Sequence, residues 1–302
     1  MTKPIGPTTN LLAVMSAEDY HKTRALNSSA FSDLEKSEEH YFAKYLDPQR
    51  EPDKPSDEMD LGTAVHQAVL EPKLFVENYI VIPTTAPKKP TKAQLEAKSP
   101  SDKTIESIAW WDAFYKENKG AKFISLKDFE VVTKIALMVR SHPTASAIFN
   151  SGVAERSVFW KDERTGVLCK ARLDFISDEF SAVIDLKTAR DASARGFARA
   201  VRSRGYHRQA AWYMEAYTQV YGKPPKNFIW AVWETSPPYA VAFYSPHPAD
   251  LERARGDILI LKDRYARALE TNVWRGYPEE IQVLRSFWSD DFDGLADELE
   301  SF

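Results

Sequence analysis

Two aspartates and a lysine lie close together in the middle of the chain, in an arrangement that suits phosphodiester hydrolysis. Asp174 lies near the end of one apolar segment, and Asp185 and Lys187 lie two residues apart in the next. Alternate residues of a strand share a face, so Asp185 and Lys187 are expected to point the same way. Neighbouring carboxylates repel unless a cation lies between them, and hard oxygen ligands favour Mg²⁺ or Mn²⁺ over zinc. With a lysine to orient or deprotonate a water, these residues could hydrolyse a phosphodiester beside the metal.

The pattern is weak by itself, because an aspartate and a lysine on an edge strand are usually only solvated. Glu155 strengthens it from the preceding predicted strand, as does His66, which follows the small residues of a predicted helix. Tyr206 and Gln209 share one face of a later predicted helix. Each has an ordinary alternative. His66 could be a hydrogen-bonded core histidine, Gln209 a buried amide or surface residue, and Glu155 a solvent-facing strand residue.

The second half of the chain contains both predicted strands and predicted helices, which would position these residues. Apolar segments predict five strands, at 154–160, 167–176, 182–186, 228–233 and 240–244. Helical patterns cover 192–202, 206–221 and 249–270. Helices therefore precede a β-β-β-α-α-β-β series, and a further helix follows it. This order predicts an α/β fold with a central mixed sheet flanked by helices.

The first half, 1–150, is mainly helical in pattern and carries His66. Phe31, Leu34 and Tyr41 recur at helical spacing after the cap signal Asn27–Ser29. Further helices are predicted at 61–70, 105–116 and 126–139.

One segment of this half is poor in apolar residues. Pro83–Lys103 has four prolines and five lysines, so we expect a mobile surface loop or linker rather than a DNA-contacting loop. Trp110 and Trp111 follow it, and we expect them to form an aromatic core rather than a base-stacking platform.

Composition limits the class of protein. The 302 residues are 43% hydrophobic, so the chain can bury a sizeable core and general disorder is excluded. Cys169 is the only cysteine, which excludes an intrachain disulfide framework and a four-cysteine zinc or iron–sulfur site. No apolar run approaches the roughly 20 residues that span a bilayer. We therefore expect a soluble cytoplasmic protein of one domain, 1–302, without a membrane partner.

Charge is unevenly distributed, although the net charge is only −4. A basic stretch follows Lys187, and Arg195, Arg199 and Arg202 within it recur at helical spacing. A charge run is usually only a solvated face, but one beside a metal site is better explained as a track for DNA phosphates. The DNA-contacting arginines expected there are Arg190, Arg195, Arg199, Arg202 and Arg208.

Two further segments have alternative roles. Ser28 and Ser29, at a predicted helix start, are candidates for holding a terminal 5′-phosphate, but simple N-capping is the preferred role. The last segment, 276–302, is acidic and partly amphipathic. A solubilising tail is preferred there over a docking segment for a partner or a neighbouring subunit.

Four motifs, taken together, resemble a known family. They are Gly62-Thr63-Ala64-Val65-His66, Arg172-x-Asp174-Phe175, Asp185-Leu186-Lys187-Thr188 and Tyr206-x-x-Gln209-Ala210. Each is unspecific alone, but their order and spacing resemble the RecE (exonuclease VIII) branch of the PD-(D/E)XK nucleases. Residues 26–32 resemble the start of that nuclease domain, so the resemblance covers residues 20–275. Leu173 departs from the family pattern, in which proline often precedes the first aspartate, and we expect this to affect only loop backbone.

The resemblance implies a restriction-endonuclease-like core, with the catalytic sheet in 151–275. Asp174 and Asp185 would ligate the metal together with the Leu186 carbonyl. His66 would be a further ligand or a contact to the scissile phosphate. Lys187 would position or activate the attacking water.

Other residues would support this centre. Gln209 and Tyr206 would steady Lys187 and the nucleic-acid backbone. Glu155 would be a supporting acid near the metal, and Thr188 a contact to DNA.

The implied activity is Mg²⁺-dependent degradation of one strand of linear double-stranded DNA from its 5′ end, with Mn²⁺ as a substitute. It leaves a 3′ single-stranded tail for a single-strand-annealing recombination protein in a bacterial or phage-infected cell. Relatives form rings, so a homo-oligomer is implied, with a tetramer preferred to a trimer. Two alternatives stay open: an endonuclease or single-strand-specific nuclease of the same fold, and a catalytically silent DNA-binding module.

Overall fold

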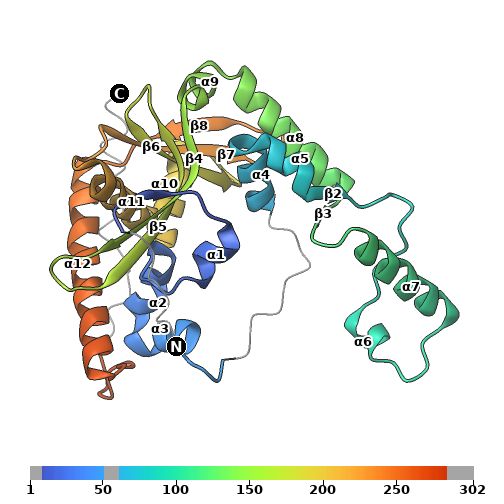
Figure 1. Cartoon of the computed structure of the whole chain (residues 1–302), viewed down its shortest axis with the longest axis horizontal. Coiled ribbons are helices and arrows are strands. Elements are labelled where there is room, and N and C mark those ends of the chain that lie inside the picture. The colour runs from blue at the N-terminus through green and yellow to red at the C-terminus, as the bar shows by residue number, and fades with distance from the viewer. Residues whose placement is uncertain (1–8, 51–60, 284–302) are drawn as a thin grey trace.

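A six-stranded sheet forms the centre of the protein, whose computed structural model describes residues 9–50 and 61–283. The order is β1-β4-β5-β6-β7-β8, in which β6 and β7 are parallel and the other neighbours antiparallel (Figure 1). The strands are β1 (Leu12–Ala13), β4 (Gly152–Lys161), β5 (Leu168–Ser177), β6 (Ala182–Ala189), β7 (Asn227–Glu234) and β8 (Val241–Tyr244). The predicted mixed sheet flanked by helices is confirmed.

Helices cover both faces of the sheet. One face packs against α4 (Leu61–Leu70), α5 (Pro72–Asn78), α8 (Leu126–Ser141) and α9 (Pro143–Phe149). The other packs against α2 (Phe31–Lys36), α3 (Glu38–Tyr45), α10 (Ala194–Arg204), α11 (Tyr206–Tyr221) and α12 (Pro248–Thr271). In β6, Ile184 and Leu186 lie in the first core and Val183 in the second. Strand alternation therefore directs Asp185 and Lys187 toward α10 and α11.

The N-terminal helices differ from the prediction. In place of the expected single helix, the structure has a 3₁₀ turn at Ser28–Ala30 followed by α2 and α3. The two helices are separated at Ser37, whose hydroxyl caps the N-terminus of α3. Asn27 occupies the N-cap position of the turn, and no side-chain capping bond is made there. The N-capping role predicted for Ser28 and Ser29 is therefore wrong, since both lie inside the turn.

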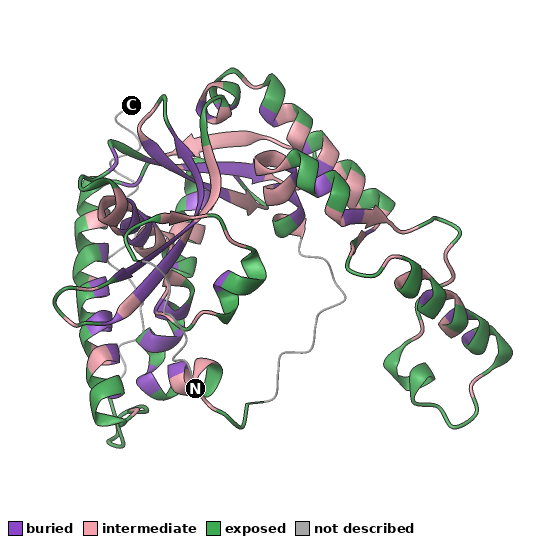
Figure 2. Cartoon of the chain, in the orientation of Figure 1, coloured by how far each residue is buried: buried purple, intermediate pink, exposed green. Residues whose placement is uncertain are grey.

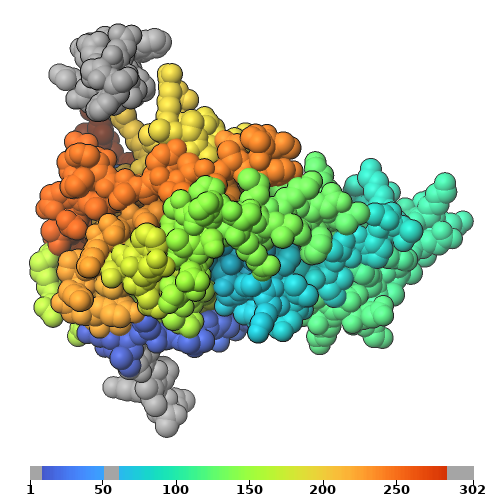
Figure 3. Space-filling model, turned by 90° about the horizontal axis from the view of Figure 1, so that it is seen from above, coloured from blue at the N-terminus to red at the C-terminus, as the bar shows by residue number. Residues whose placement is uncertain are grey.

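A second difference is an arm, residues 82–121, that projects from the body (Figures 1 and 3). It begins after β2 (Tyr79–Val81) and ends before β3 (Lys122–Ile124), two short strands that pair in parallel. The arm contains α6 (Lys92–Leu95) and α7 (Asp102–Glu117). The predicted loop 83–103 thus carries a short helix, and its backbone accepts hydrogen bonds from α7 at Pro87 and Lys88.

Three further observations concern short elements, the acidic C-terminal segment and membrane-spanning helices. β1, β2, β3 and α1 (Ala17–Lys22) are too short to give a clear periodic signal and were not predicted. Most of the acidic segment 276–302 lies at 284–302, outside the described residues. None of the described helices is long and apolar enough to cross a bilayer.

Candidate active site

Acidic side chains form a row across β4, β5 and β6. Ala154 pairs with Phe175 and Arg156 with Leu173, so Glu155 lies opposite Asp174. The last pair between β5 and β6 is Phe175 with Ile184. Asp174 and Asp185 are the next residues in this register, so they lie opposite each other. The residue Asp174 is 8% exposed and Asp185 is fully buried. Three acids from three strands therefore meet at one place, two of them almost removed from water.

Backbone geometry is unusual at this place. Glu155 has a left-handed φ of 52°, which costs a non-glycine residue about 1 kcal/mol or more. Leu173 and Phe175 belong to cores on opposite faces, so the alternation of β5 is broken at Asp174. Leu173 is a fully buried strand residue, which corrects the expectation that this position affects only loop backbone.

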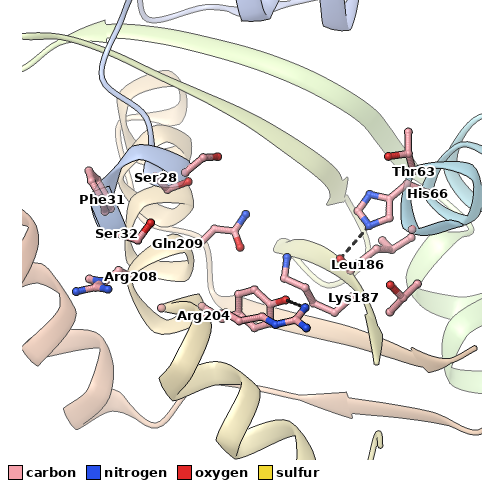
Figure 4. A pocket seen from close by; sticks show the side chains of 15 residues that line it. Ser28, Phe31, Ser32, Thr63, His66, Leu186, Lys187, Arg204, Arg208 and Gln209 are labelled. Atoms are coloured by element: carbon pink, nitrogen blue, oxygen red, sulfur yellow. Dashed lines mark hydrogen bonds between the residues drawn. The ribbon is translucent and has the colours of Figure 1, made fainter. Parts of the chain in front are cut away.

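Asp174 is held by a backbone donor and faces a histidine. The Leu186 N–H donates to Asp174 Oδ2 over 2.9 Å, and His66 Nδ1 lies 3.6 Å from the same oxygen. His66 Nε2 donates to the Leu186 carbonyl over 3.0 Å, because a carbonyl can only accept (Figure 4). Burial, aided by the Lys187 charge, lowers the pKa of His66, so the ring is neutral. Its Nδ1 lone pair then faces the carboxylate of Asp174.

Glu155 completes this group. Ligand atoms of His66, Glu155 and Asp174 all lie within 4.8 Å of one another. Arg172 Nε donates to Glu155 Oε2 over 2.5 Å, and Arg172 is itself anchored to the Met15 carbonyl over 3.0 Å. Glu155 is therefore positioned by a fixed guanidinium rather than pointing into solvent.

Lys187 lies against Asp185 on the same strand. Its Nζ is 2.5 Å from Asp185 Oδ2 and 4.7 Å from the centre of the Tyr206 ring. Burial alone would lower the pKa of Lys187, but the charges of Asp185 and Asp174 outweigh it and raise the pKa. The side chain is thus an ammonium group suited to donating a hydrogen bond.

The donor set fits a divalent cation. Within the described part of the chain, neither buried oxygen of Asp185 receives a hydrogen bond of normal geometry. Burial raises the pKa of Asp174 and of Asp185 to about 6 against the opposing effect of Lys187. Buried carboxylates without donors are costly unless a cation compensates them. Oxygens from Glu155, Asp174 and Asp185 suit Mg²⁺, and the His66 nitrogen also suits Mn²⁺.

A cavity of about 450 Å³ opens beside this centre (Figure 4). Lys187, Thr188, Tyr206 and Gln209 line it, and Ser28 and Ser29 lie on its far wall. Other lining residues are His66, Leu186, Phe31, Ser32, Gly62, Thr63, Arg204, Gly205 and Arg208. The fold therefore brings the 3₁₀ turn, α4, β6 and α11 together around one polar space.

The predicted DNA-binding residues divide into two groups. Thr188, Ser28, Ser29 and Arg208 line the cavity, and Arg208 also pairs with Glu35 at 2.7 Å. The others are exposed and do not line it: Arg190, Arg195, Arg199 and Arg202. A phosphate track along α10 thus stays a prediction.

The supporting residues make partly different contacts from those expected. Tyr206 lies under Lys187, as the resemblance implies, and its hydroxyl accepts a hydrogen bond from Arg204 over 3.1 Å. The Gln209 amide nitrogen donates to the Tyr213 hydroxyl over 3.0 Å, and no hydrogen bond joins Gln209 to Lys187 among the described residues. Its amide group nevertheless lines the cavity.

Three residues with clear contacts to the site were missed. Arg172 precedes Asp174 by two positions, and this spacing could have indicated its role. Tyr213 is buried, and the nearby charges of Asp174 and Asp185 add to burial in raising its pKa. Arg204 reaches the cavity because Gly205, with a left-handed φ of 66°, turns the chain between α10 and α11.

Comparisons with known proteins find one family and several solved structures that are similar to the chain. The family model described as a PDDEXK-like domain of unknown function (DUF3799) matches residues 27–287. A solved structure from Eubacterium rectale, provisionally named an exonuclease, is 17% identical, with 96% of this chain and 100% of that chain covered and a TM-score of 0.56. A phage-related exonuclease from Haemophilus somnus 129PT is 10% identical, with 62% and 92% covered and a TM-score of 0.32. No curated protein matches the chain significantly.

Proposed function

Because the chain belongs to the family of PDDEXK-like domains of unknown function (DUF3799), we propose that it is a metal-dependent exodeoxyribonuclease. Its substrate would be linear double-stranded DNA, one strand of which is degraded from the 5′ end with Mg²⁺. The 3′ single-stranded tail would serve recombination by single-strand annealing. The family match confirms the PD-(D/E)XK resemblance, whereas membership of the RecE branch stays a prediction.

The observation that carries this proposal is the state of Asp185. Its carboxylate is fully buried, its one cationic contact among the described residues is the Lys187 ammonium 2.5 Å from Oδ2, and Asp174 lies opposite it. A purely structural role would leave one ammonium group, that of Lys187, to compensate two buried acids that repel each other. A divalent cation would resolve this conflict: His66, Glu155 and Asp174, whose ligand atoms lie within 4.8 Å of one another, would hold it, with Asp185 as the further ligand that the resemblance implies. Such a cation, when bound, polarises a phosphate and lowers the pKa of a bound water.

The chain's own residues have distinct tasks in this proposal. Lys187 donates a hydrogen bond to the attacking water or to a phosphate oxygen, and the Tyr206 ring keeps its ammonium group in place. Leu186 N–H orients Asp174, and Arg172 orients Glu155. The raised pKa of Lys187 argues against its acting as a base, because the ammonium group has no free lone pair.

The cavity supports action at DNA ends. Arg204 and Arg208 line it together with the hydroxyls of Ser28, Ser29 and Ser32. Cations and hydroxyls of this kind bind a phosphate through charge-assisted hydrogen bonds. A terminal phosphate carries more charge than an internal diester, so such a cavity would favour a strand end. The name of the Eubacterium rectale structure is in keeping with this.

Partners remain part of the proposal. A closed ring would hold duplex DNA topologically, and for this reason we propose a homo-oligomer, with a tetramer preferred to a trimer. An annealing protein would receive the single-stranded product.

A time course on linear duplex labelled at either the 5′ or the 3′ end tests the function, with a closed circular plasmid beside it and Mg²⁺ or EDTA in each case. We expect Mg²⁺-dependent loss of the 5′ label as mononucleotides and an intact plasmid. Cutting of the plasmid would favour an endonuclease. Intact DNA under every condition would leave the silent DNA-binding module.

A further inference from the structure

The arm, residues 82–121, has a small aromatic core of its own. Trp111 is 7% exposed, its indole N–H donates to the Pro87 carbonyl over 3.1 Å, and Lys89 lies over its ring. Phe114 and Tyr115 pack against Trp111, and Phe123 of β3 packs against both of them. The remaining surface of the arm is mostly exposed (Figure 2). The prolines and this core hold the arm's two backbone segments in place around α7.

One side of the arm forms a hollow that combines an aromatic ring with positive charge. Trp110 is half-buried and lines a hollow of about 750 Å³. Phe114 stacks on the Trp110 ring at 5.1 Å between centroids. Lys88, Lys89 and Lys103 surround the hollow, and Glu106 is the acidic residue among those that line it. Neither Lys88 nor Lys103 forms an ion pair with any of the described residues.

We propose that this hollow binds single-stranded DNA. A nucleobase would stack on Trp110, because every base offers a flat face and such stacking is independent of sequence. Its flanking phosphates would contact Lys88 and Lys103, as in other basic grooves with aromatic platforms. Duplex DNA keeps its bases stacked inside the helix, so it could use the lysines but not the ring. Lysine is depleted at protein–protein interfaces, which favours nucleic acid over a second copy of this chain.

The position of the arm gives this site a role, which rests on the proposed function. The arm leaves the body at β2 and β3, beside α5 in the helical layer that carries His66 (Figures 1 and 3). Degradation of one strand leaves its complement single-stranded near that layer. The arm would hold this product strand and so slow release of the enzyme from DNA.

The test measures binding of a fluorescent oligothymidylate of about 20 nucleotides, longer than common site sizes, to the whole protein in EDTA. We expect Trp110→Ala to weaken binding about fivefold or more, and Trp110→Phe to weaken it less. The pair Lys88→Ala and Lys103→Ala should weaken binding. It should also lower the magnitude of the slope of log affinity against log salt concentration by about 1.4, or about 0.7 per lost phosphate contact. The matched pair Lys116→Ala and Lys119→Ala removes equal charge from the end of α7 and the turn that follows it, outside the hollow, and should change little.

Three results would overturn the site. The first is that Trp110→Ala binds oligothymidylate as tightly as the wild type. The second is that the two lysine pairs lose equal affinity. The third is that the variants change the subunit number but not oligothymidylate binding, which would mean that a second copy of the chain occupies the hollow. Thermal unfolding of each variant separates loss of the site from loss of the fold. Duplex degradation with Mg²⁺ is measured in parallel. If the wild type does not degrade duplex but the variants bind oligothymidylate as expected, only the proposed nuclease function is refuted. If the wild type degrades duplex but the variants bind oligothymidylate like the wild type, only the arm site is refuted.

Discussion

Replacing Asp185 with asparagine should stabilise the metal-free protein while it abolishes nuclease activity. Asp185 is fully buried, and burial raises its pKa from 3.8 to about 6. An aspartate whose pKa is higher in the folded protein than in the unfolded chain contributes stability below about pH 4 and loses it as the pH rises through 6. At neutral pH the wild type therefore carries a buried ionised group that the neutral amide would remove.

The size of the effect follows from the pKa. A difference of about 2 units corresponds to roughly 3 kcal/mol of destabilisation at neutral pH. This figure already includes the attraction of Lys187, 2.5 Å away, because its charge opposes burial in setting the pKa. We expect a net gain of about 2–3 kcal/mol, or about 3–5 °C in Tm for a chain of this size.

Thermal unfolding in EDTA at about pH 7.5 and about pH 4.5 measures this difference. Asp185→Asn should have the higher Tm at neutral pH, and the gap should close in acid. Mg²⁺ should raise the Tm of the wild type and not that of the variant. A variant that is less stable than the wild type in EDTA at neutral pH would refute the reasoning, as would an equal response to Mg²⁺.

Asp162→Asn is the matched control, because the surroundings of Asp162 lower its pKa whereas those of Asp185 raise its pKa. Burial would raise the pKa of Asp162, but hydrogen bonds from Lys262 and Thr165 outweigh it and lower the pKa to about 2. Asp162 therefore contributes stability above about pH 4 that is lost as the pH falls through 2. The same substitution should lower the Tm at neutral pH, since it leaves buried Lys262 with Glu215 as its remaining ion-pair partner.

Three more predictions concern the same region. Lys187→Ala should lower the rate of duplex degradation at least about 100-fold while DNA binding in EDTA persists, and unchanged activity would exclude Lys187 from the chemistry. Arg208→Ala should weaken preference for a 5′-phosphorylated over a 5′-hydroxyl end, measured as the ratio of kcat/KM; an unchanged ratio would place end recognition elsewhere. Mg²⁺ binding followed by calorimetry should weaken below about pH 6, because Asp174 and Asp185, each with a pKa of about 6, must lose their protons first; binding that is independent of pH would contradict this.

The predictable parts of the fold are those with a strong local signal. β4 to β8 and α11 alternate or repeat over enough residues for their period to be visible, and α11 spans 206–221 as predicted. β1 to β3 have two or three residues each, too few for any period. The break between α2 and α3 depends on one capping serine, Ser37, inside an apolar pattern that reads as continuous.

The site was predictable where its residues share one strand and unpredictable where they meet across the fold. Asp185 and Lys187 lie two apart on β6, so strand alternation alone places them together. His66 contacts the Leu186 carbonyl from 120 residues away. The sequence named it as a candidate, but only the resemblance favoured a site residue over a core histidine. Helical spacing correctly grouped Arg195, Arg199 and Arg202. It could not tell that this group does not line the cavity, whereas Arg204 and Arg208, on either side of Gly205, do.

The other buried charges of the chain strengthen the case for Asp185. Lys262 is 2% exposed and contacts both Asp162 at 2.7 Å and Glu215 at 2.5 Å. Lys170 is 3% exposed and donates to the carbonyls of Tyr20 and Thr23, each over 2.8 Å. The fold thus provides partners for buried charges where they serve only structure. Asp185 has the Lys187 ammonium 2.5 Å away and no further donor among the described residues, beside a second buried acid. Such a local conflict is expected where a site is built for a ligand, and it supports the proposal of a metal at this end of β6.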